Sequence, residues 1–235
     1  MEKKYLERET PPVISKLVEI VNKAEEYLWR GMLNAYERKH PGEKLTYGGA
    51  GNDLDLSILQ PGDIIIYSAY SRDLNPPELM GILGPVLELL LIYLLGGQCG
   101  HTAVYVGEGK LVEGLPITIR KVDYEIVHTA GSVEVYRVKT TEGIKGKAVK
   151  FCESKVGVSY GILHCLPLFY PIAKHVEGEQ YYCSELAWAA YKSAGIDINA
   201  YPELHLSPPI NGFALAPQNI CDSDNVELIA SAGKR

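Results

Sequence analysis

The sequence predicts an α+β fold in which helices pack beside an antiparallel sheet. Short apolar and β-branched runs follow one another between residues 64 and 138, and Gly107-Glu108-Gly109 separates two of them as a hairpin turn would. Two helices are predicted farther along, over residues 143–156 and 182–194. Gly195 follows the second of these as a typical C-terminal glycine.

The individual strands are predicted from short runs bounded by turn residues. The turn from Leu59 to Asp63 leads into the first run, and Asp63 is expected to satisfy backbone N–H groups of that turn. The predicted strands cover residues 64–67, 102–106, 110–113, 117–121, 133–138 and 226–230.

The first forty-five residues are predicted to form a helical appendage packed on a single catalytic domain of residues 46–235. Apolar residues recur at helical spacing over residues 13–40, after Pro11-Pro12 and before Pro41-Gly42. This stripe fits packing against the domain and a dimer contact equally well, so the oligomeric state stays open.

An apolar insertion is predicted over residues 75–97. Its core, from Leu79 to Leu95, is short for a membrane span and contains Pro85 and Glu88. A pair of buried helices is the favoured interpretation. A hydrophobic lid or a peripheral membrane contact beside the active site is the alternative.

Composition excludes some classes of partner. The net charge of −6 and the lack of a basic run argue against nucleic acid. The charged N-terminus has no apolar stretch typical of a secretory signal, so a cytoplasmic location is expected. There Cys99, Cys152, Cys165, Cys183 and Cys221 should be mostly reduced. No cofactor or metal is expected, and Cys99 with His101 is only a weak metal signal.

Cys183 and His101 are the candidate catalytic pair. Cys183 stands at the predicted start of a helix, where the positive end of the helix dipole favours thiolate over thiol. His101 stands at the predicted start of a strand. A fold that joins them would supply a nucleophile and its base.

Glu113 is the candidate that orients the histidine, if the hairpin register allows it. A three-residue turn pairs position 106 with 110 and 103 with 113, which makes His101 and Glu113 diagonal neighbours on one face. A two-residue turn pairs 104 with 113 and places Glu113 on the opposite face. The sequence permits the favourable register.

The order of these motifs resembles the circularly permuted branch of the NlpC-like papain-fold cysteine enzymes, especially the YiiX-like group. The resemblance rests on five segments and on a tail from Ala216 to Leu228, in shared order. The five segments are Leu59–Asp63, Gly100–Gly107, Lys110–Glu113, Val156–Tyr160 and Tyr181–Trp188.

The resemblance implies a papain-like core, an antiparallel half-barrel packed against helices. It assigns Cys183 as nucleophile, His101 as base and Glu113 as the orienting residue. The backbone N–H of Cys183 would contribute to an oxyanion hole, and Tyr182 or Tyr181 would help to shape it.

Three functions follow as hypotheses. The first is hydrolysis of an amide bond in a peptide or amino-acid conjugate. The second is a lipid acyl hydrolase or acyltransferase, because the branch also resembles lecithin:retinol acyltransferase-like enzymes and residues 79–95 suit an acyl chain. The third is a non-catalytic binding module on the same fold.

Overall fold

The protein is an α+β fold in which a curled sheet packs against helices. The computed structural model describes Arg38 and residues 51–67, 101–115, 118–161, 180–202 and 215–233. The predicted appendage (except Arg38), the predicted apolar insertion over residues 75–97, Cys99 and Cys165 lie outside the described residues. No helix in the described part combines the length and apolarity that crossing a bilayer requires.

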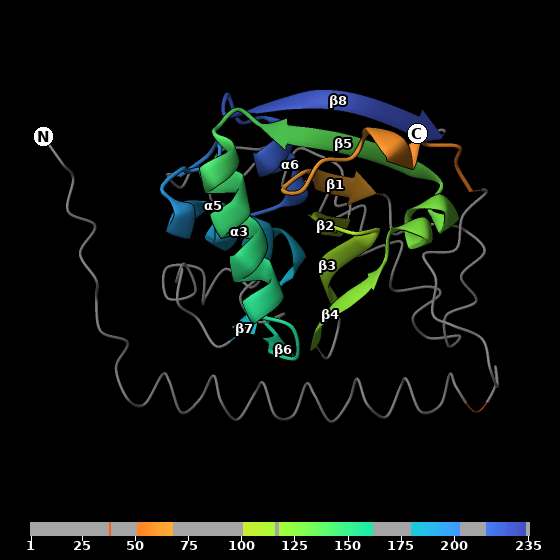
Figure 1. Ribbon diagram of the computed structural model, residues 1–235, viewed down its shortest axis with the longest axis horizontal. Helices are drawn as coiled ribbons and strands as arrows, with labels where there is room; N and C mark the ends of the chain where they lie inside the picture. Colours follow the sequence, from red (N-terminus) through yellow and green to blue (C-terminus); the bar gives the residue numbers. More distant parts are fainter. Residues whose placement is uncertain are drawn as a thin grey trace, which may run out of the picture.

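Eight strands form one sheet in the order β7-β6-β4-β3-β2-β1-β5-β8 (Figure 1). Neighbouring strands are antiparallel except for the short parallel pair β6–β7. The strands are β1 (Ile64–Tyr67), β2 (His101–Gly107), β3 (Lys110–Leu115), β4 (Thr118–Asp123), β5 (Ser132–Val138), β6 (Ser159–Tyr160), β7 (Gln180–Tyr181) and β8 (Val226–Gly233). The six predicted strands are confirmed, with ends shifted by a few residues, and β6 and β7 are additions.

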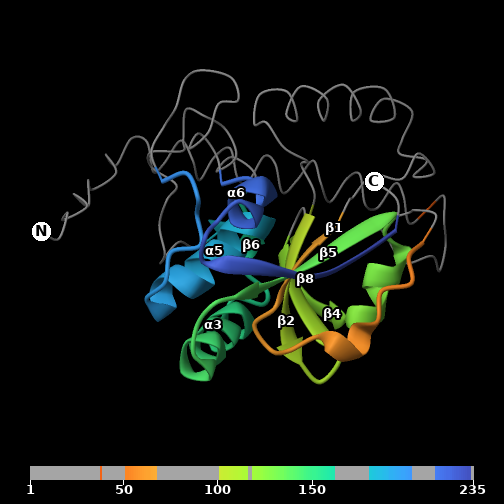
Figure 2. The same ribbon diagram turned by 90° about the horizontal axis from the view of Figure 1, so that it is seen from above.

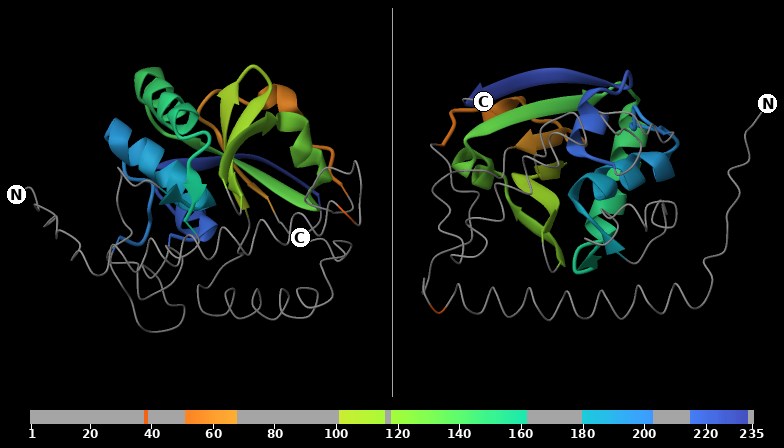
Figure 3. Two further views of the ribbon diagram at one scale, coloured as in Figure 1. Left: turned by 90° about the horizontal axis from the view of Figure 1, so that it is seen from below. Right: turned by 180° about the vertical axis from the view of Figure 1, so that it is seen from behind.

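Helices cover one face of this sheet. They are α3 (Glu142–Ser154), α5 (Cys183–Ala194) and α6 (Pro217–Cys221), of which α3 and α5 were predicted. Figures 2 and 3 show the three gathered on one side of the strands. The short 3₁₀ helices η1 (Leu56–Ile58) and η2 (Tyr124–Thr129) lie on the other side.

Alternating side chains give each face its own apolar core. The helix-side core includes Ile64, Ile66, Val104 and Val112 with the buried face of α5. The other core includes Ile65, Ala103, Leu111 and Val135 with residues from η1 and η2. A slip of one residue would move the side chains of a central strand from one core to the other. Because both faces are covered, the register of these strands is tightly specified.

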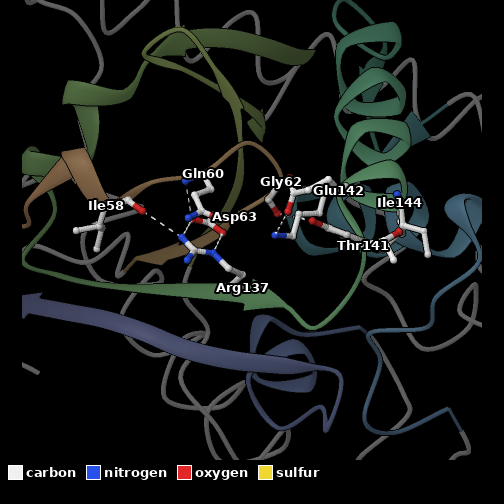
Figure 4. A network of polar contacts seen from close by, with 10 residues as sticks. Ile58, Gln60, Gly62, Asp63, Arg137, Thr141, Glu142 and Ile144 are labelled. Atoms are coloured by element: carbon white, nitrogen blue, oxygen red, sulfur yellow. Dashed lines mark hydrogen bonds and ion pairs between the residues drawn. The ribbon is translucent and has the colours of Figure 1, made fainter.

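A buried ion pair ties the entry of β1 to β5 (Figure 4). Asp63 is fully buried, and its carboxylate accepts hydrogen bonds from Arg137 Nε at 2.8 Å and from the Gln60 N–H at 2.8 Å. A second Arg137 nitrogen lies 2.7 Å from Asp63 Oδ2 and also donates to the Ile58 carbonyl. The predicted turn role of Asp63 is confirmed, and the partner Arg137 was not predicted.

Candidate active site

Cys183 is the first residue of α5, as predicted. The preceding Tyr182 is extended, with φ −88° and ψ 174°, and its N–H donates to Glu185 Oε2 at 3.3 Å. This contact satisfies one of the N–H groups left open at a helix start. The partly buried thiol of Cys183 therefore lies at the positive end of a twelve-residue helix.

His101 is the first residue of β2, and its ring is brought to the thiol. The imidazole is almost fully buried and hydrogen bonds with Cys183. Its Nε2 lies 3.1 Å from Glu113 Oε2. With Nε2 facing Glu113, Nδ1 is the ring nitrogen left for the thiol.

Glu113 reaches His101 through the register that the sequence permitted. Ala103 pairs with Glu113, so that part of the register prediction is confirmed. The predicted pairing of Val106 with Lys110 is wrong, because Lys110 pairs with Gly107 and Val106 lies in a bulge.

The turn itself has two residues, not three. Glu108 and Gly109 both have positive φ, 52° and 69°, as a type I′ hairpin turn requires. Such a turn alone would pair residue 104 with Glu113. The extra residue in β2 moves the pairing by one and returns Glu113 to the face of His101.

Two further residues complete the site, and the sequence prediction missed both. Tyr67 lies opposite His101 across β1–β2, and its hydroxyl donates a short hydrogen bond to Glu113 Oε2. Arg120 lies opposite Glu113 across β3–β4, with Nε 2.8 Å and a terminal nitrogen 2.7 Å from Oε1. The alternation of side chains along each strand could have placed both residues on the face of Glu113. That alternation becomes informative only once the strand registers are known.

The electrostatics favour a thiolate–imidazolium pair. Burial raises the pKa of the Cys183 thiol, but the His101 charge and hydrogen bond and the Thr102 and Ser184 N–H groups outweigh it and lower that pKa. Burial likewise lowers the pKa of His101, while Cys183 and Glu113 raise it, to about 9. The lowered pKa of Cys183 and the raised pKa of His101 both favour a negative thiolate beside a positive imidazolium near neutral pH.

The other two described cysteines lack such partners. Burial raises the pKa of Cys152 to about 12 and that of Cys221 to about 11. Burial acts in the same direction on all three thiols, toward a higher pKa. Cys183 is therefore distinguished by its charged neighbour, which reverses the net direction there.

Tyr181 and Tyr182 place their side chains in the interior. The Tyr181 ring packs edge-on against Phe151, with centroids 5.9 Å apart. The Tyr182 hydroxyl accepts a hydrogen bond from the Leu215 N–H at 2.9 Å. Their suggested role in shaping an oxyanion hole stays a prediction.

Comparison with known proteins gives a likeness to a solved structure. No family model matches the chain, and no curated protein matches it. The crystal structure of metalloprotein YiiX from Escherichia coli O157:H7 matches with a TM-score of 0.50 and 18% identity, over 74% of this chain and 98% of that one. At this identity the likeness concerns the fold alone. The chain has a YiiX-like fold.

The described residues do not fit a metal site of the kind that the word metalloprotein suggests. No group of three or more His, Cys, Asp or Glu side chains gathers among them. Glu113 Oε1 accepts from Arg120, and Oε2 accepts from Tyr67 and faces His101, so both oxygens are occupied by protein partners.

Proposed function

We propose that this protein is a cysteine hydrolase that cleaves an amide bond in a peptide or amino-acid conjugate. The observation that carries the proposal is the connected series Cys183–His101–Glu113 at the N-terminus of α5. Cys183 acts as nucleophile, His101 as acid and base, and Glu113 orients the imidazole. The permuted papain-like relationship is part of the same proposal.

The reaction follows from this arrangement. The Cys183 thiolate attacks the substrate carbonyl carbon, and the resulting oxyanion forms near the Cys183 N–H at the positive end of α5. The His101 imidazolium gives its proton to the leaving amine, and an acyl-thioester forms. Neutral His101 then takes a proton from water, the hydroxide attacks the thioester, and the acid and thiolate are released.

Trapping of the acyl-enzyme tests the proposal. The protein is incubated with the p-nitrophenyl esters of N-acetylalanine and of octanoic acid, and intact and peptide mass spectrometry locate the adduct. An N-acetylalanyl adduct on Cys183, lost in Cys183→Ala and kept in Cys221→Ala, is the expected result. Turnover is then measured on amino-acid p-nitroanilides.

Two other results would overturn the proposal. An octanoyl adduct alone, without amide turnover, would assign the site to lipid acyl chemistry. No adduct from either ester, together with a Cys183 that behaves as an ordinary thiol, would leave the non-catalytic binding module.

A further inference from the structure

Glu113 is a fully buried carboxylate whose two oxygens have different partners. Arg120 donates to Oε1 through Nε, and a terminal nitrogen of the same guanidinium lies 2.7 Å from that oxygen. Tyr67 donates to Oε2, the oxygen that faces His101 Nε2. A buried carboxylate is costly unless a cation and hydrogen bonds compensate it.

The sheet fixes this division of partners. Tyr67 and His101 are direct cross-strand partners, and Glu113 and Arg120 are direct partners on the next strand pair. The Tyr67 ring also meets the His101 ring edge-on, with centroids 5.2 Å apart. Guanidinium contact with Oε1 leaves Oε2 for the imidazole.

We propose that Arg120 and Tyr67 are positioning residues, which hold Glu113 as an ionised acceptor with Oε2 aimed at His101 Nε2–H. The proposal rests on the proposed function and names which residues control the protonation of its base. An ionised Glu113 fixes the imidazole tautomer that carries its proton on Nε2 and turns Nδ1 toward Cys183.

The consequence has a definite sign. Without Arg120, the buried Glu113 takes up a proton and ceases to stabilise the His101 imidazolium. The pKa of His101 then falls, and the pKa of Cys183 rises with the loss of its cationic partner. If Arg120 merely screened Glu113, its removal would have the opposite effect, because the unscreened carboxylate would strengthen the imidazolium and lower the thiol pKa further.

The charged and titratable side chains around this group come from five described elements. Tyr67 of β1, His101 of β2 and Arg120 of β4 face Glu113 of β3, and Cys183 of α5 faces His101. Glu185 of α5 accepts from the backbone N–H of Tyr182 beside the thiol. Substitutions at Tyr67 and Arg120 therefore test the positioning of the pair without removing the Cys183 thiol or the His101 imidazole.

The first experiment measures the rate of Cys183 alkylation by iodoacetamide against pH, by mass spectrometry. We expect Arg120→Gln to raise the midpoint by at least about one pH unit, Tyr67→Phe by less, and Arg120→Lys to restore part of the loss. Lys121→Gln is the matched control. It removes the next cation on β4, a surface partner of Glu153, and should leave the midpoint unchanged.

A double-mutant cycle shows whether the effect passes through Glu113. In a Glu113→Gln background, Arg120→Gln should change the midpoint little further. A midpoint that falls in Arg120→Gln, or an equal rise in both backgrounds, would overturn the proposal. If Arg120→Gln does not fold, Tyr67→Phe carries the same test, because the ring that contacts His101 remains.

A second readout separates this proposal from the proposed function. In Cys183→Ala, which cannot react, ¹⁵N chemical shifts of His101 should report the Nε2–H tautomer and lose that preference when Arg120→Gln or Tyr67→Phe is added. An unchanged tautomer overturns the positioning role. A wild-type Cys183 that titrates near the free-thiol value of about 8.5 overturns the cysteine hydrolase instead.

Discussion

At the residue scale, the charge partner His101 contributes most to lowering the pKa of Cys183, and the N–H groups of Thr102 and of Ser184 at the start of α5 add to it. Cys183 and Cys152 both belong to helices, yet the pKa of Cys152 is raised to about 12 and that of Cys183 is lowered. Cys152 is buried among apolar neighbours, whereas Cys183 meets His101. A position at a helix start was a useful signal only in combination with that histidine.

Removing the imidazole should therefore reverse the direction of the Cys183 shift. In wild type, the lowered thiol pKa keeps the thiolate present as pH falls below the free-thiol value of about 8.5. In His101→Ala, burial remains and raises the pKa, so the alkylation midpoint should move above that value. A midpoint in His101→Ala at or below that of wild type would contradict this prediction.

In the wild-type protein at pH 7, peptide mass spectrometry should find Cys183 alkylated well before Cys152 and Cys221. Equal alkylation rates at all three cysteines would contradict this second prediction.

In the proposed reaction, the imidazolium sets the alkaline limit. The pKa of His101 is raised to about 9, so the proton needed by the leaving amine is present below that pH and lost above it. Amide turnover should fall as pH rises through about 9, while alkylation of Cys183, which needs no proton donor, should not. A parallel fall of both rates would mean that the protein unfolds, which circular dichroism at each pH would detect.

At the element scale, the approach of α5 to β3 depends on a residue without a side chain. A Cβ on Gly114 would lie 3.2 Å from the Tyr160 ring and 3.4 Å from the Cys183 backbone nitrogen. Gly114 follows Glu113 and so faces the helix side of the sheet. Its lack of a side chain lets the first residue of α5 come close to the strand that carries Glu113.

Gly114→Val should therefore slow Cys183 alkylation by about tenfold or more, because a displaced α5 separates the thiol from His101. Gly146→Ala in α3 is the matched control, since a Cβ there meets nothing within 4 Å. That change should leave the rate unaltered and stabilise the helix by roughly 0.5–1 kcal/mol. Equal alkylation rates in both variants would show that the approach of α5 has no role.

The hairpin shows why part of the site was predictable and part was not. Glycines at positions 107 and 109 indicated a turn, and the alternation of β2 and β3 allowed Glu113 to face His101. The bulge at Val106 carries no sequence signal of its own, yet it fixes which face Glu113 takes. Tyr67 and Arg120 belong to the site through long-range pairings, and a local pattern does not contain those.

At the scale of the whole molecule, the site depends on strand order more than on any single element. β4, β3, β2 and β1 are consecutive in the sheet, and β1, β2 and β4 each contribute one side chain around Glu113 of β3. α5 brings the thiol from the helix-covered face. The site therefore requires both cores to be formed, since one sets the registers and the other seats the helix.

The Asp63–Arg137 ion pair should stabilise this arrangement without entering the chemistry, because it lies at the opposite end of β1 from Tyr67. Arg137→Met leaves a fully buried carboxylate without its cation, which should lower the free energy of unfolding by about 3 kcal/mol. In an Asp63→Asn background the same change should cost less, because no charge is left uncompensated. Urea denaturation at pH 7 measures both differences. The Cys183 alkylation midpoint should stay unchanged in every folded variant. An equal cost of Arg137→Met in the two backgrounds would assign its contribution to packing of the Arg137 side chain and not to the ion pair.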